Sequence, residues 1–175
     1  MEALMKNIYV MFAGYNRWAN DRVYAAARAL PEDAYMADRG AFFGSVHRTL
    51  NHLIVTDRIW MHRFTGEGPV HVRLDEVPYD DLAALSEARD AENERIIGYV
   101  EGLSESQLAA TFTYRPITNP RDVTQPLAPA LSHLFNHQTH HRGQVHGLIT
   151  AIAGKDAGPS LDLIAYQRES GQGMR

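Results

Sequence analysis

The chain has 175 residues, of which 45% are hydrophobic and 22% charged, and it contains no cysteine. This length suits one globular domain, which we expect to span residues 1–175. The formal net charge of −4 and the lack of a Lys/Arg cluster argue against nucleic acid as a partner. Without cysteine the chain has no disulfide, no thiolate nucleophile and no Cys-ligated metal, so any metal must be held by nitrogen and oxygen.

The N-terminal segment predicts a helix and not a targeting signal. Glu2, Lys6 and Arg17 interrupt the apolar run that a signal peptide needs, so we expect a cytoplasmic protein that does not bind membranes. Residues 4–30 place apolar side chains at a spacing of three to four, which predicts a helix that ends at Pro31.

The rest of the chain predicts three further long helices. Residues 31–44 are expected to be an irregular connection, after which Ser45 is suited to cap a second helix that runs to about Thr65. A third helix is predicted from Asp80 or Asp81 to Gly102, and a small β-hairpin from 111–114 and 122–124. A fourth helix is predicted from Pro126 to Gly154. In the tail, the apolar residues at 161–166 are expected to pack back onto the bundle as a short turn. The predicted fold class is therefore all-α, a four-helix bundle.

Five of the nine histidines lie in the predicted fourth helix, namely His133, His137, His140, His141 and His146. His137 and His141 lie only ~40° apart on a helical wheel, next to its apolar face, whereas His133 and His140 rotate toward the flank and His146 points elsewhere. A lone buried histidine is usually a hydrogen-bonded structural residue. Two adjacent buried imidazoles would each need a separate partner unless they share a cation, so this pair indicates a metal site.

A catalytic metal needs a third ligand from another helix, and His52 is the best candidate. It lies in the middle of the second helix at the margin of the apolar face, whereas His62 falls nearly opposite that face and His47 is turned by ~140°. His71 is expected in a solvated loop. Gln138 follows the first histidine of the pair where a helical zinc protease has its catalytic Glu, which disfavours a peptidase.

Four stretches carry a resemblance to a known family: YNRWAN at 15–20, FFGSVHRTLNHLIVTDRIW at 42–60, LFNHQTHHRGQV at 134–145 and SLDLIAYQRE at 160–169. They resemble the DinB family of four-helix metalloenzymes, which is related to thiol-dependent transferases of the YfiT and mycothiol-dependent maleylpyruvate isomerase type. The resemblance implies a bundle with one long crossover connection, a homodimer, a metal on His52, His137 and His141, and a low-molecular-weight thiol at the open metal position.

Several polar residues are candidates to line the pocket or to orient the ligands. Asp57 intrudes on the apolar face of the second helix, where it is either a fourth ligand, an acceptor behind the ligands or, more simply, the ion-pair partner of an Arg on another helix. The other candidates, for which packing and surface polarity are the alternative account, are Asn16, Trp18, Asn20, His140, Arg142 and Gln144.

Three functions follow from this pattern. The leading one is an enzyme that binds a divalent metal and activates a thiol cosubstrate, as an S-transferase or isomerase acting on a small molecule. The alternatives are a metal-dependent hydrolase that uses water, and a non-catalytic metal-binding stress or regulatory protein. An all-imidazole site suits zinc or nickel, which are the metals expected after purification, and also iron or copper.

Overall fold

The computed structural model describes residues 4–173. Its elements are, in chain order, α1 (Leu4–Arg28), α2 (Glu32–Met36), α3 (Val46–Thr65), α4 (Leu82–Gly102), α5 (Glu105–Ala109), β1 (Thr111–Tyr114), β2 (Val123–Pro126), α6 (Leu127–Ala153), the 3-10 turn η1 (Lys155–Ala157) and α7 (Leu163–Ser170). The fold is all-α with one antiparallel hairpin, in which Thr113 pairs with Thr124. This confirms the predicted fold class.

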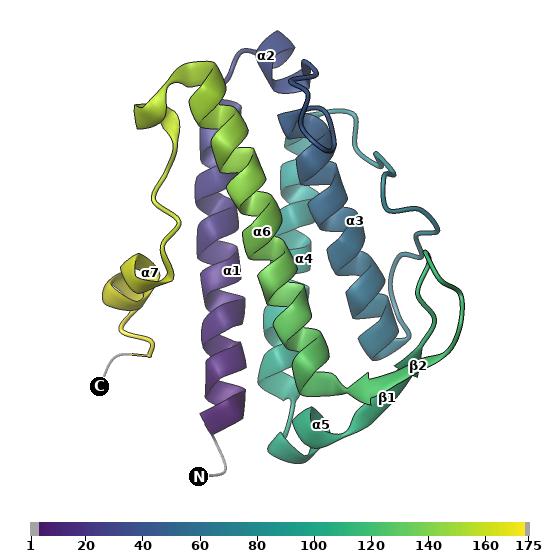
Figure 1. The fold of residues 1–175 in the computed structure, drawn as a ribbon. Coiled ribbons are helices and arrows are strands. Elements are labelled where there is room, and N and C mark those ends of the chain that lie inside the picture. Colours follow the sequence, from purple (N-terminus) through teal and green to yellow (C-terminus); the bar gives the residue numbers. More distant parts are fainter. Residues whose placement is uncertain (1–3, 174–175) are drawn as a thin grey trace.

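Four long helices form the bundle (Figure 1). α1 and α3 each pack against both α4 and α6. α1 and α6 run in one direction, and α3 and α4 run in the other. Because α3 and α4 follow each other in the chain and are parallel, residues 66–81 must return along the whole bundle between them, as the predicted crossover connection.

Local signals at the helix ends explain where α3 and α4 begin and end. The Ser45 hydroxyl accepts a hydrogen bond from the amide of Arg48, and the Asp81 carboxylate accepts one from the amide of Ala84. Gly66 ends α3 with φ of 75°, a conformation that L-residues with a Cβ rarely adopt. The sequence predicted Ser45 as a cap, Asp81 as one of two possible starts of α4, and an end of α3 at about Thr65.

The short elements differ from the prediction. The expectation that 31–44 is wholly irregular is wrong, because it contains α2. The tail forms the helix α7 instead of a single turn, and α5, which a capping box between Ser104 and Gln107 begins, was not predicted. Helices of one or two turns are too short to show a clear hydrophobic period, so tertiary packing decides whether they form.

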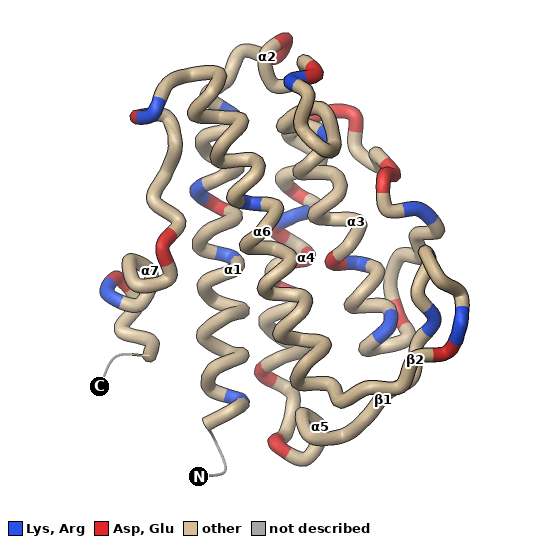
Figure 2. Tube along the Cα trace, in the orientation of Figure 1, with Lys and Arg blue, Asp and Glu red and all other residues tan. Residues whose placement is uncertain are grey.

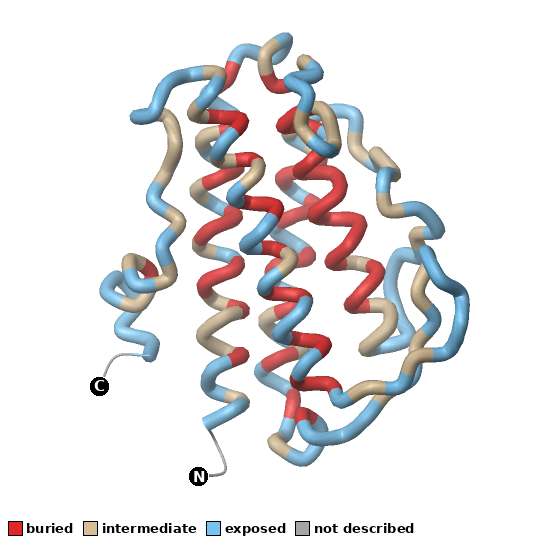
Figure 3. The backbone as a smooth tube through the Cα atoms, in the orientation of Figure 1, coloured by how far each residue is buried: buried red, intermediate tan, exposed pale blue. Residues whose placement is uncertain are grey.

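The apolar core has two large clusters along the bundle and a small third one of Tyr15, Ala19 and Tyr166. One large cluster includes Val23 and Leu50, and the other large cluster includes Tyr9 and Leu131. Between them lies a layer of buried polar side chains, which we call the polar layer: Asn16 and Asn20 of α1, Asp57 of α3, Arg89 and Asn93 of α4, and Gln138 and Arg142 of α6. Figure 3 shows the buried residues continuing through the middle of the four helices, so this layer lies inside the bundle.

Charged residues are spread over the helices and connections but are rare on α6 (Figure 2). The only Lys, Arg, Asp or Glu of α6 is Arg142, whereas α4 carries seven such residues and the crossover at 66–81 carries six. Among residues 4–173, no helix combines the length and the apolar character that crossing a lipid bilayer demands.

Candidate metal centre

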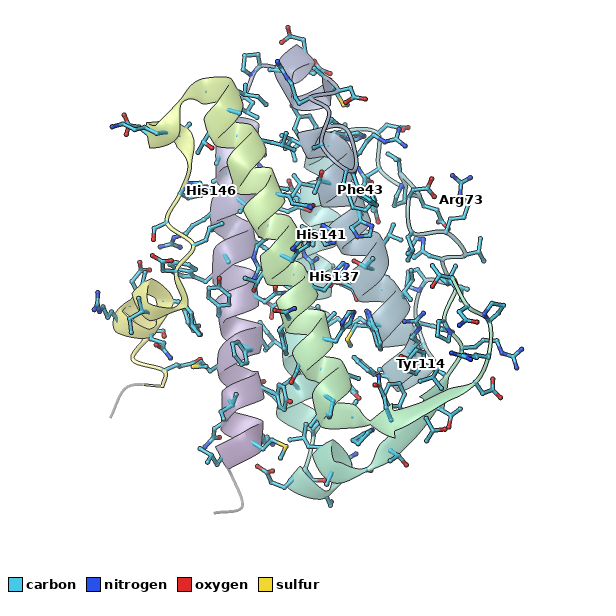
Figure 4. All side chains as sticks on the ribbon, viewed as in Figure 1. Phe43, Arg73, Tyr114, His137, His141 and His146 are labelled. Atoms are coloured by element: carbon cyan, nitrogen blue, oxygen red, sulfur yellow. The ribbon has the colours of Figure 1, made fainter. Side chains whose placement is uncertain are left out.

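Three histidines meet where α3 packs against α6. His52 lies in the middle of α3, and His137 and His141 lie one turn apart on α6 (Figure 4). One ring nitrogen of each histidine lies within 4.8 Å of those of the other two. The Nε2 atoms of His137 and His141 are 3.1 Å apart. The structure therefore brings the three residues that were predicted as ligands into one group.

Hydrogen bonds to the far side of two rings set their orientation. The Nδ1–H of His52 donates to the carbonyl oxygen of Leu74 over 2.7 Å, and the Nδ1–H of His141 donates to Oε1 of Gln144 over 2.7 Å. With the proton on Nδ1, each ring keeps a free lone pair on Nε2. Such an outer hydrogen bond is typical of histidines that bind metals.

Among the described residues, the Nε2 atoms have no hydrogen-bond partner outside the group, which is the test of whether the group fits a metal. Nε2 of His52 is buried and makes no hydrogen bond. Burial lowers the pKa of His52 to about 4 and that of His137 to about 3, and it also lowers the pKa of His141. All three rings are therefore neutral at neutral pH, and one ring nitrogen of each meets those of the other two. A divalent cation would satisfy these lone pairs, so the group fits the metal that the sequence predicts.

Aromatic packing and the crossover hold the group in place. The ring of Phe43 stacks on His52 at 3.9 Å between centroids, with 23° between the planes, and meets His141 edge-on. Phe43 and Leu74 belong to the connections before and after α3, so both connections fix His52. Neither residue was predicted to take part.

A cavity of about 240 Å³ opens beside His52 and His137. Its walls come from α3, the crossover, the hairpin and α6, with the lining residues His52, Thr56, Ile59, Trp60, Arg63, Leu74, Tyr114, Pro116, Ile117, Thr118, His133 and His137. Arg63 follows His52 at a spacing of eleven, about 20° from three whole helical turns, whereas Trp60 at a spacing of eight is turned by about 80°. The spacing of eleven is the sequence signal that could have identified Arg63.

Asp57 points away from the histidines, into the polar layer. Its carboxylate accepts a hydrogen bond from Arg89 of α4 over 2.6 Å, and the side chains are 0% and 2% exposed. Burial is the largest single influence and by itself lowers the pKa of Arg89, but Asp57, Tyr24 and Glu92 together raise this pKa, so the guanidinium stays charged. The simplest interpretation of Asp57, an ion pair with an Arg of another helix, is confirmed, and Asp57 does not join the metal group.

Three of the other candidates belong to the polar layer and do not line the cavity. Arg142 donates to the side-chain oxygens of Asn16, Asn20 and Gln138. None of these four residues lines the cavity beside the histidines. The alternative account of Asn16, Asn20 and Arg142, packing within the bundle, therefore describes them.

The remaining candidates, Trp18, His140 and Gln144, do not line the cavity either. The indole of Trp18 donates to Glu169 of α7 over 2.7 Å, and Arg22 lies 3.7 Å above its ring, so Trp18 fastens α7 to α1 instead of lining the cavity. His140 is exposed and contacts Gln144 at 3.3 Å. Gln144 contacts His141, as its position on the wheel predicted.

Most of the other histidines lie away from the cavity, and His133 is the exception. His133 lines the cavity. His146 lies on the other side of α6 (Figure 4). His71 lies in the crossover as predicted, but the expectation that it is solvated is wrong, because its side chain is 8% exposed and donates to Glu76 over 2.7 Å.

Two comparisons with known proteins agree with this geometry. The family model described as "DinB family" matches residues 5–168. Protein DinB of Bacillus subtilis (strain 168) is 23% identical over 147 residues, which cover 77% of this chain and 80% of that protein. The match spans the four helices and all three clustered histidines. The chain belongs to the DinB family.

Proposed function

We propose that this protein is an enzyme that binds one divalent metal ion and uses a low-molecular-weight thiol as cosubstrate, in an S-transferase or isomerase reaction. The observation that carries the proposal is the group of three neutral imidazoles whose free nitrogens meet at the wall of a cavity. Three protein ligands and an adjacent space suit a catalytic metal, because a structural site would be closed by a fourth side chain.

The chemistry of the lining favours a thiol over water as the nucleophile. No carboxylate lines the cavity, so His133 is the one histidine outside the proposed ligands that could act as a general base toward water. A bound divalent ion would supply a Lewis acid that lowers the pKa of a ligand, and a thiol, with a pKa near ~8.5, needs far less help than water, with a pKa near ~15.7. Since the chain has no cysteine, the thiol must come from outside.

The residues of the chain then have separate tasks. His52, His137 and His141 hold the ion, and Leu74 and Gln144 hold two of those rings in place by hydrogen bonds to Nδ1. In the cavity wall, His133 is a lining residue that can accept a proton, because burial lowers its pKa and keeps the ring neutral. Trp60 and Ile59 give the wall an apolar side that excludes water.

Zinc or nickel is the metal that we propose to find after purification. Imidazole nitrogen is a good ligand for zinc, nickel, copper and iron, and the general affinity order places nickel and copper high. Elemental analysis of the purified chain identifies the ion. One equivalent in the wild type and none in His52→Ala or His137→Ala is the expected result. His62→Ala, which changes a histidine of the same helix outside the group, is the matched control and keeps its metal.

Turnover assays separate the thiol from the water reaction. The metal-loaded protein is offered electrophilic substrates with bacillithiol, mycothiol, glutathione or no thiol. We expect product only with one of the thiols, and none from His52→Ala. Turnover of equal rate without any thiol contradicts the transferase and supports hydrolysis instead. A metal with four protein ligands and no turnover under any condition supports a binding protein without catalysis.

A further inference from the structure

Arg63 is a cation of the cavity wall without an acidic partner. Its guanidinium lies 4.6 Å above the ring of Trp60 and 4.8 Å above that of Tyr114. It makes no hydrogen bond or ion pair with another residue in the range 4–173, although its side chain is partly buried. Nearby arginines differ: Arg58 meets Glu92, and Arg115 meets Asp122. The five N–H donors of Arg63 are therefore available to a ligand.

The cavity has no negative charge to balance this cation. None of its lining residues is acidic, and Arg63 is the only one of them that is charged at neutral pH. The two aromatic rings stabilise the guanidinium through their π faces but offer no hydrogen-bond acceptor in the plane of its donors. A planar carboxylate matches that donor fork and would pair with it in two parallel hydrogen bonds.

The size and the other walls of the cavity define the rest of the ligand. A volume of about 240 Å³ lies below the ~300–1,000 Å³ typical of drug-sized ligands, so the occupant is small. Ile59, Pro116 and Ile117 provide an apolar side. The ligand that fits is a small carboxylate with an apolar body.

The two ends of the cavity have different chemistry. The Cα atoms of His52 and Arg63 are separated by about 16 Å along α3, from ~1.5 Å of rise per residue. Helical side chains lean toward the N-terminus, so the long side chain of Arg63 leans toward His52 and shortens this separation. A carboxylate held by Arg63 would leave the opposite end of a short molecule beside the histidines.

We propose that Arg63 is the anion-binding residue of this cavity and that the substrate of the enzyme is a small carboxylate, oriented with its carboxylate at Arg63 and its reactive carbon toward His52 and His137. This proposal rests on the proposed function for the identity of the reaction. The binding of the carboxylate itself depends only on the cavity and can be measured without turnover.

The fluorescence of Trp60 provides the measurement. The chain has two tryptophans, and Trp18→Phe leaves Trp60, which lines the cavity, as the single reporter. Full-length protein in this background is titrated with benzoate and with its neutral counterpart benzamide, both as purified and after removal of metal with EDTA. We expect saturable binding of benzoate in both forms, at least fivefold tighter than that of benzamide.

Substitution of the arginine then tests its role. We expect Arg63→Gln to weaken benzoate binding at least fivefold while benzamide binding stays unchanged, which also shows that the cavity is intact. Arg63→Lys should recover part of the loss, because it restores the charge without the planar fork. Arg168→Gln removes an exposed charge from α7 and is the matched control for net charge.

Three results overturn the proposal: no saturable benzoate binding by the wild type, a loss below fivefold in Arg63→Gln, or binding that requires the metal and ignores Arg63. The last would place the carboxylate on the ion. Failure of the proposed function gives a different result. Benzoate would still bind at Arg63, but the protein would hold no metal or would not turn over substrate with a thiol.

Discussion

The bundle contains two groups of buried polar residues that lie close together and differ in how they are satisfied. In the polar layer, Asp57 pairs with Arg89, and Arg142 donates to oxygens from α1 and α6. In the histidine group, Nε2 of His52 has no partner, and two further Nε2 atoms face each other at 3.1 Å. Buried atoms without a partner occur in both groups, so the difference lies in their chemistry. The polar layer pairs guanidinium groups with a carboxylate and with amides of the bundle, whereas the histidine group brings together only imidazole nitrogens, which suit a metal ion.

The largest effect is expected from breaking the polar layer. Asp57→Ala leaves the buried guanidinium of Arg89 without its counter-charge, which should lower the free energy of unfolding by about 3–5 kcal/mol. Urea denaturation followed by circular dichroism measures this change. The double variant Asp57→Ala/Arg89→Met should be more stable than Asp57→Ala alone, and strictly additive losses would show that the two side chains are not coupled.

The milder variant Asp57→Asn sharpens the distinction between the two groups. If Asp57 belongs to the polar layer alone, Asp57→Asn keeps the metal stoichiometry of the wild type. Loss of the ion from folded Asp57→Asn protein would make the carboxylate part of the metal centre.

The next effect comes from adding a ligand to the histidine group. A metal that binds only the folded chain stabilises it by about 2.7 kcal/mol at a concentration of 100 times its Kd. Thermal unfolding of wild-type protein stripped of metal should therefore shift upward when zinc is added. His52→Ala should lose the shift and His62→Ala should keep it. Equal shifts in all three proteins would mean that zinc binds elsewhere.

A smaller effect is expected from the residue behind a ligand. Gln144 accepts the Nδ1–H of His141, and loss of such an outer hydrogen bond typically weakens metal binding about 10–100-fold. Competition with a chromophoric chelator should show this loss in Gln144→Ala. His140→Ala, which changes an exposed neighbour of Gln144, should bind the metal as the wild type does. Wild-type affinity in Gln144→Ala would mean that the ring of His141 is oriented by its packing alone.

The smallest effect concerns a buried histidine outside both groups. Nδ1 of His47 lies 3.1 Å from the hydroxyl of Tyr35, and burial lowers the pKa of His47. The unfolded chain therefore binds a proton more readily than the folded chain does, and stability falls as the pH drops below the usual pKa of ~6.5. His47→Gln should remove this contribution, so that its stability relative to wild type improves between pH 7 and pH 5. A difference that does not change with pH would show that His47 titrates alike in both states.

The sequence predicts the parts of this molecule that depend on neighbours along the chain. Ser45, Asp81 and Gly66 mark helix ends by local hydrogen bonds or backbone conformation, and the spacing of His137 and His141 follows from helical geometry. His52 was predicted as their partner because it lies at the edge of an apolar face. The packing of α3 on α6 is what brings the three rings together, and that packing follows from the bundle.

The unpredicted parts depend on contacts between distant segments. The indole of Trp18 contacts Glu169 across more than a hundred residues, and the carbonyl of Leu74 belongs to a connection with no periodic pattern. Every residue has a backbone carbonyl oxygen, so residue type does not predict which one accepts the hydrogen bond from His52. The walls of the cavity come from such connections, which explains why the ligand histidines were easier to predict than the pocket beside them.

The crossover at 66–81 has a consequence for how new specificity can arise in this architecture. Since α3 and α4 are parallel, their link has to pass the middle of the bundle, where it supplies Leu74 to both the cavity and His52. Replacing the side chain of Leu74, the one residue of 66–81 that lines the cavity, changes one wall of the pocket without a substitution in any helix. Grafting a different crossover onto the same four helices is thus the shortest route to an enzyme with a new substrate, provided that the carbonyl beside His52 stays in place.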